Sequence, residues 1–192
     1  NKIINIAKEI RNHNSEIGLC IMGYLNNLFI YGINKFAKDI SGVIDAVICV
    51  DLPSDVIEEK QLKEVLKKEN IALIKLITPT TSDERIKEIV KDAEGFVYSV
   101  NVEGQTGVKS ANLDKVNSQI ERIKKFTKIP VVSGFGIKNE EDVKVFSKSK
   151  ADGIVLGSAI VKKIQEKYHE TRDKHIVANF LKSYCKELIK NL

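Results

Sequence analysis

Short apolar runs that alternate with amphipathic stretches are the feature that most constrains the fold of this 192-residue chain. Most of the runs are rich in valine, isoleucine and leucine and do not alternate with polar residues, which is typical of parallel strands covered on both faces. We predict strands over residues 17–22, 46–50, 71–77, 95–100, 129–133 and 153–156. Helices are expected at 1–11, 30–38, 57–68, from Ser82 onward, at 113–126, 140–147 and 159–166, and around Cys185. This order predicts an α/β fold with parallel strands.

Glycines follow the last two predicted strands. Gly134 and Gly136 come after one of them, and Gly157 with Ser158 comes after the next, directly before a helix. Where a strand turns into a helix, glycine lets a ligand approach the backbone, and the first helical N–H groups and the helix dipole favour an anion. In a (β/α) barrel, the last two strand-to-helix loops often form a phosphate site. The alternative is that these glycines only permit tight turns.

The place of these glycines in the chain decides between two parallel-sheet architectures. A doubly wound sheet would carry the fingerprint G-x-G-x-x-G after its first strand, and the sequence has none there. We therefore expect a (β/α)8 TIM barrel. A closed barrel has eight strands and typically ~250 residues, whereas we predict six strands in 192 residues. Residues 1–192 are expected to form a single incomplete barrel domain of about six β/α units. The first two units would lie upstream or come from a partner, because unpaired strand edges are avoided.

Composition and charge exclude several classes of function. No apolar run approaches the ~18 residues of a membrane-spanning helix. The three cysteines lack C-x-x-C spacing, so we expect core residues in a reducing cytoplasm and no metal site. The net charge of +5 comes from lysines spread over predicted helices, and aromatic residues make up only 6% of the chain. We expect neither a membrane nor a nucleic acid as partner, and a mild preference for anionic substrates.

Six short motifs carry a resemblance to a known family. They lie at 22–24 (MGY), 51–53 (DLP), 77–81 (ITPTT), 104–107 (GQTG), 134–137 (GFGI) and 157–161 (GSAIV). In this order and spacing the chain resembles the tryptophan synthase α chain family, over roughly the last two-thirds of that family. The resemblance implies a lyase of tryptophan biosynthesis that cleaves indole-3-glycerol phosphate to indole and glyceraldehyde 3-phosphate. It also implies an αββα assembly, in which indole passes to a β chain that holds pyridoxal phosphate.

Cleavage of that carbon–carbon bond is a retro-aldol step, which needs a general acid at the indole ring and a general base. In the family these groups are a Glu and an Asp that would lie upstream of this chain. We therefore expect no catalytic residue, no cofactor and no metal in residues 1–192. Glu103 departs from the family pattern; a solvated loop charge and an acid–base role are both open for it.

The resemblance assigns binding roles to eight residues. Backbone N–H groups, with one hydroxyl, would hold the substrate phosphate at Gly107, Gly136, Gly157 and Ser158. Residues that would line the indole pocket or take part in loop closure are Tyr24, Tyr98, Thr106 and Asp51. For Tyr24 and Tyr98 the alternative is an ordinary half-buried tyrosine, and for Thr106 and Asp51 it is an ordinary turn residue.

Two other functions remain open from the sequence. The chain could be a non-catalytic phosphate-binding barrel or a β-chain-binding regulatory module. Another phosphate-binding barrel enzyme, such as a ribulose-phosphate epimerase or a thiamin-phosphate synthase, is a weaker alternative, because it would need metal-ligating histidines at strand ends or a pyrophosphate site. The histidines His13, His169 and His175 lie away from the predicted strand ends and are expected at the surface.

Overall fold

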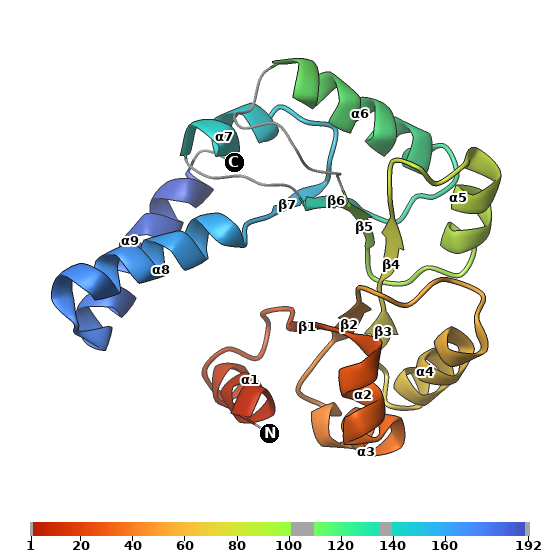
Figure 1. The fold of residues 1–192 in the computed structure, drawn as a ribbon, viewed down its shortest axis with the longest axis horizontal. Coiled ribbons are helices and arrows are strands. Elements are labelled where there is room, and N and C mark those ends of the chain that lie inside the picture. The colour runs from red at the N-terminus through yellow and green to blue at the C-terminus, as the bar shows by residue number, and fades with distance from the viewer. Residues whose placement is uncertain (1, 101–109, 135–139, 191–192) are drawn as a thin grey trace. The chain divides into compact units, whose positions relative to one another are not determined.

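The computed structural model describes residues 2–100, 110–134 and 140–190 (Figure 1). It divides into two compact units, which are described here separately. Unit 1 comprises Asn1–Leu76 and Glu84–Val97, and unit 2 comprises Ile77–Asp83 and Tyr98–Leu192. The expectation of one domain over 1–192 remains a prediction.

The described strands form two sheets. The first contains β1 (Cys20–Gly23), β2 (Ala46–Cys49) and β3 (Ala72–Leu73) in that order, with parallel pairing. The second contains β4 (Lys75–Ile77), β5 (Val97–Val100), β6 (Val131–Gly134) and β7 (Gly153–Val155) in that order. β6 and β7 are parallel, with Val132 opposite Gly153 and Gly134 opposite Val155. Each predicted strand overlaps an observed one. The third, predicted as a single strand at 71–77, is divided into two strands, β3 and β4.

Helices connect the strands as the alternation predicts. Their bounds are α1 (Lys2–His13), α2 (Leu25–Tyr31), α3 (Ile33–Ile40), α4 (Ile57–Lys68), α5 (Asp83–Val90), α6 (Ser110–Lys124), α7 (Glu140–Phe146), α8 (Ser158–Thr171) and α9 (Lys174–Ile189) (Figure 1). The prediction of a single helix at 30–38 is wrong, because two helices, α2 and α3, lie there. Gly32 has a φ of +88°, a conformation that interrupts a right-handed helix, so α2 ends before it and α3 begins after it.

The core of unit 1 forms where β2 packs among helices. All four residues of β2 are buried, as are Ile40 of α3 and Leu62 and Leu66 of α4. Directly before β2, the Asp45 carboxylate pairs with the Arg11 guanidinium of α1 at 2.6 Å. The same guanidinium donates a hydrogen bond to the Val43 carbonyl. These contacts fix α1 against the sheet.

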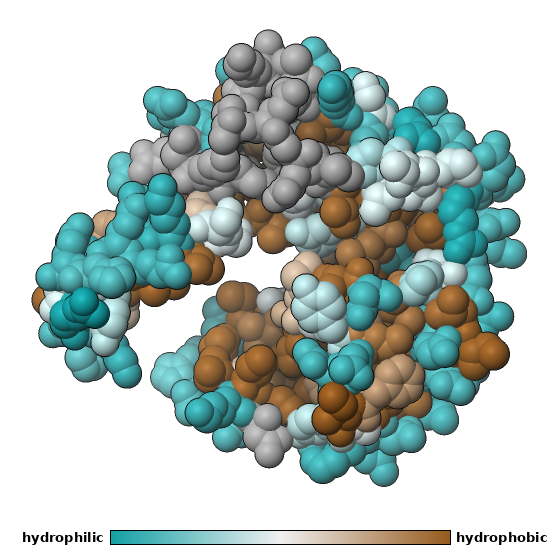
Figure 2. Space-filling model, viewed as in Figure 1, coloured by the Kyte–Doolittle hydropathy of each residue, from teal (hydrophilic) through white to brown (hydrophobic). Residues whose placement is uncertain are grey.

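Apolar side chains also reach the surface of unit 1. One row of α1 is buried at Ile4 and Ala7, whereas Ile3, Ile6 and Ile10 are exposed. Figure 2 shows hydrophobic side chains at the surface on the viewed face. The prediction that Cys20 is a core residue is wrong, since alternate residues of β1 are exposed and Cys20 is one of them. Cys49 is buried, as predicted.

Candidate functional site

The turn from β7 into α8 leaves backbone N–H groups available. Gly157 is the N-cap residue of α8, and none of the side chains in the described part of the chain caps this helix. The first N–H groups of a helix have no intrahelical acceptor, so those of α8 have no capping side chain among the described residues to accept from them. A β-carbon built on Gly157 would meet nothing within 4 Å. By contrast, the Asp173 carboxylate caps α9 and accepts from the N–H of His175 at 2.7 Å. The start of α8 is thus an open, electropositive backbone surface.

Ser158 is the first residue of α8 and is exposed. Its side chain lines an open hollow along the helix together with Lys162 and Gln165. The hydroxyl can donate a hydrogen bond, and the Lys162 ammonium one turn further along lies 3.9 Å from the Glu166 carboxylate. The predicted phosphate residues Gly157 and Ser158 therefore lie together at the carboxyl end of β7, where barrel ligands bind.

Tyr98 stands on β5 and faces Gly134 on the neighbouring β6. In both strands the residues at alternate positions are buried, and Tyr98 and Gly134 lie on the less buried face. Burial raises the pKa of the Tyr98 hydroxyl. The tyrosine side chain fills the space beside Gly134 in which a β-carbon would stand. The sequence pattern predicted that Gly134 lets a ligand approach the backbone or permits a tight turn; no local pattern reveals that its neighbour is a tyrosine 36 positions earlier in the chain.

In unit 1, Asp51 caps the start of α2, directly after Tyr24. Tyr24 is the N-cap residue of this helix, but its side chain makes no capping hydrogen bond. The Asp51 carboxylate takes that role and accepts from the N–H of Leu25 at 2.7 Å. It also accepts a hydrogen bond from the Cys49 thiol at 3.5 Å. Asp51 therefore connects the loop after β2 to the loop after β1, at the edge of the sheet where both strands end.

Tyr24 and Asp51 are both exposed, and 59% of the Tyr24 surface is accessible. Burial, reinforced by the hydrogen bond and the charge of Asp51, raises the pKa of the Cys49 thiol to about 12. The predicted residues Thr106, Gly107 and Gly136, and also Glu103, lie outside the described residues. His13, His169 and His175 are exposed, as predicted. Over residues 2–100, 110–134 and 140–190, no group of three or more potential ligands is arranged to hold a metal ion.

Comparison with known proteins decides the family. The tryptophan synthase alpha chain family matches residues 1–190. This chain belongs to that family. It is 40% identical over 165 residues to the tryptophan synthase alpha chain of Erythrobacter litoralis, covering 85% of this chain and 62% of that one. It is 36% identical over 166 residues to that of Geotalea daltonii, covering 86% and 61%. The chain therefore spans less than two-thirds of the length of these relatives.

Solved structures of tryptophan synthase alpha chains share the fold. The subunit from Campylobacter jejuni superimposes with a TM-score of 0.78 at 34% identity, over 94% of this chain and 68% of that one. In the tryptophan synthase α2β2 complex of Pyrococcus furiosus, the TM-score is 0.81 at 33% identity, over 97% and 72%. The predicted fold class is confirmed: the chain has the α/β fold of these barrels, with parallel strands and intervening helices. None of the helices in the described part of the chain is both long and apolar enough to span a membrane.

Proposed function

We propose that the native polypeptide containing this chain is an α-type tryptophan synthase lyase, which cleaves indole-3-glycerol phosphate to indole and glyceraldehyde 3-phosphate. The observation that carries the proposal is the uncapped start of α8 in a member of this family. A β-carbon on Gly157 would meet no other atom of the described residues within 4 Å, and Ser158 stands beside it. A phosphate dianion fits this arrangement, because unpaired N–H groups and the positive end of the helix dipole both stabilise negative charge.

The binding half of the reaction is assigned to residues of this chain. The α8 turn would hold the phosphate, and the predicted phosphate residues Gly107 and Gly136 would add their N–H groups. Tyr98 would contact the indole ring through its aromatic face, because a half-buried tyrosine on the open face of β5 presents apolar area and a polar tip. Holding the substrate at both ends fixes the bond to be broken relative to the catalytic groups.

Asp51 and Tyr24 have a role that the capping geometry suggests. Because the Asp51 carboxylate fixes the N–H of Leu25, it also fixes the preceding residue, Tyr24, at the mouth end of β1. The family resemblance assigns Tyr24 to the indole pocket, and we propose that Asp51 positions the loop that carries it. The proton transfers of the retro-aldol step need an acid and a base, which we expect outside residues 1–192.

The partner is proposed to be a tryptophan synthase β chain. The Pyrococcus furiosus relative is part of an α2β2 complex, and its reported property is mutual activation. Pyridoxal phosphate would belong to the β chain, with no cofactor in the present chain. We propose a cytoplasmic location, with no nucleic acid or membrane as partner.

Indole release from indole-3-glycerol phosphate tests the proposal. The native polypeptide should release indole, and addition of a β chain should raise the rate. A protein that binds the phosphate compound without releasing indole, with or without the β chain, would instead be a non-catalytic phosphate-binding or regulatory module. Release of a different product from another sugar phosphate would place it among the other phosphate-binding barrel enzymes. Thr106→Val should lower the rate of indole release if that residue takes part in loop closure.

A further inference from the structure

Helix α6 places a buried amide between two strand ends. Its inner face carries Val116, Ile120 and Ile123, all buried, and Gln119 lies among them with 6% of its surface accessible. The Gln119 side-chain nitrogen is 3.4 Å from the carbonyl oxygen of Ile77 and 3.4 Å from that of Val100. These are the last residues of β4 and β5, which are neighbours in their sheet. A side-chain amide has two N–H donors, so it can serve both carbonyls.

Arg122 follows on the same face of α6 and holds the segment after β4. Its Nε and Nη2 atoms lie 2.8 Å and 2.6 Å from one carboxylate oxygen of Asp83, and Nη2 donates to the Thr81 carbonyl at 2.9 Å. Asp83 begins α5, and Thr81 lies in the turn that connects it to β4. The planar guanidinium allows these bonds to form at once, which a lysine cannot reproduce.

We propose that Gln119 and Arg122 are positioning residues that fix the mouth ends of β4 and β5 and thereby set the place of Tyr98 in the substrate pocket. Tyr98 is two residues before Val100 and lies on the same face of the strand. A shift of the β5 end would therefore move the tyrosine relative to Gly134. The inference rests on the proposed function, because it takes Tyr98 as part of the indole site.

The chemistry of the two side chains favours this role over simple packing. Burying an amide among apolar residues costs free energy unless its donors are satisfied. Leucine would fill a similar volume at position 119 without that cost, so the amide is matched to the two strand-end carbonyls. Of the residues assigned to the phosphate, the two that the structure describes, Gly157 and Ser158, have no hydrogen bond to either side chain. Loss of the contacts made by Gln119 and Arg122 should therefore weaken indole binding more than phosphate binding at the start of α8.

Titration calorimetry on the native polypeptide tests the inference with two probes, indole and glycerol 3-phosphate. Gln119→Leu and Arg122→Met should each weaken indole binding by at least about fivefold and change glycerol 3-phosphate affinity by less than about twofold. Lys124→Met is the matched control. Lys124 lies on the same helix and also bonds a carboxylate and a carbonyl, those of Asp152 at 2.7 Å and Lys150 at 2.8 Å, but it does not contact the ends of β4 and β5. This variant should bind both probes like the parent.

Conservative variants keep the test decisive if Arg122→Met fails to fold. Arg122→Lys retains the charge and should show an intermediate loss of indole affinity, whereas Gln119→Met keeps the length of the side chain without the donors and should match Gln119→Leu. Equal losses for both probes, or the same indole loss in Lys124→Met, would show a purely structural role and overturn the inference. Unchanged indole affinity in both Gln119→Leu and Arg122→Met would overturn it too. A parent protein that binds neither probe would overturn the proposed function first.

Discussion

The side chain of Tyr98 on β5 occupies the space beside Gly134 on β6 in which any other residue would place its β-carbon. The two residues lie on the less buried face of neighbouring strands, at the position where the indole pocket is proposed. Glycine at 134 is therefore a condition for Tyr98 to stand where it does. Neither residue can be understood from its own segment of the chain.

Gly134→Ala should destabilise the protein by about 1–3 kcal/mol, because the new methyl group overlaps the tyrosine side chain. Urea unfolding of the variant and the parent measures this difference. Gly153→Ala is the control, since a β-carbon there would lie 3.5 Å from Val132, an ordinary contact. Combining Gly134→Ala with Tyr98→Ala should cost less than the sum of the single changes by at least about 1 kcal/mol. Additive effects would show that the two side chains do not compete for space.

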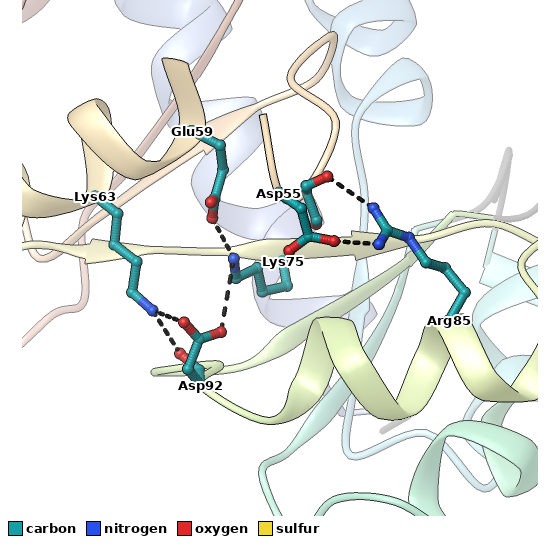
Figure 3. Close-up of polar contacts among 7 residues, drawn as sticks. Asp55, Glu59, Lys63, Lys75, Arg85 and Asp92 are labelled. Atoms are coloured by element: carbon teal, nitrogen blue, oxygen red, sulfur yellow. Dashed lines mark hydrogen bonds and ion pairs between the residues drawn. The ribbon is translucent and has the colours of Figure 1, made fainter. Parts of the chain in front are cut away.

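A buried ion pair in unit 1 gives a second prediction. Lys75 of β4 bonds to Glu59 of α4, and these residues have only 5% and 6% of their surfaces accessible. Asp92 lies 3.8 Å from the Lys75 ammonium and also pairs with Lys63 (Figure 3). Lys75→Met should cost about 3–5 kcal/mol of the free energy of unfolding, because it leaves the Glu59 charge buried without its partner.

The double variant Lys75→Met, Glu59→Leu should recover most of that loss, because two apolar side chains can replace a buried pair at little cost. Thermal or urea unfolding of the single and double variants checks this. A single variant as stable as the parent would mean that the Glu59 carboxylate reaches water in solution.

The same cluster predicts a dependence on acid. Burial opposes ionisation of Asp92, but the hydrogen bond from Lys63 and the charges of Lys75 and Lys63 lower the pKa of that carboxyl below its usual value. A carboxyl with a lowered pKa in the folded state stabilises the fold above its unfolded pKa, and the contribution is lost as pH falls through both values. The free energy of unfolding should fall less steeply below about pH 4 in Asp92→Asn than in the parent. Parallel pH curves for the two proteins would contradict the lowered pKa.

Cys49 should be almost inert toward alkylation in the folded protein. Its thiol is 2% exposed, and burial together with the Asp51 carboxylate raises its pKa to about 12, so almost none of it is thiolate at pH 8.5. Mass spectrometry of iodoacetamide-labelled peptides should show Cys49 modified only after unfolding in urea, with Cys185 as the internal reference. Labelling of Cys49 in the folded state at the rate of the unfolded chain would rule out this environment.

Local pattern was sufficient for the strands and most helices, because burial on both faces leaves a run of apolar residues that a single segment displays. It failed where the outcome depends on distant contacts. Lys75 sits inside the predicted strand 71–77 and is tolerated there only because Glu59, 16 positions earlier, supplies its counter-charge. The strand is in fact divided between β3 and β4, which belong to different sheets. Likewise, no sequence pattern indicates that Asp51 caps α2 or that Gln119 meets the ends of two strands.

Sequence patterns predicted the local structure around part of the candidate site. The glycine and serine at 157 and 158 follow an apolar strand and precede a helix, and the structure places them at an uncapped helix start as that pattern predicts. Gly134 had the same local signature, yet its close neighbour is a side chain from another strand. Spacing shows where a backbone can turn; it does not show what lies across the sheet.

Phosphate binding at the start of α8 is the central claim, and titration of glycerol 3-phosphate into the native polypeptide tests it most directly. Gly157→Ala should bind like the parent, because a β-carbon there meets nothing within 4 Å. Gly157→Asp should keep the fold, since aspartate is a favoured N-cap residue, but its carboxylate would repel the phosphate and should lower the affinity by at least about tenfold. Undiminished affinity in Gly157→Asp would contradict the account.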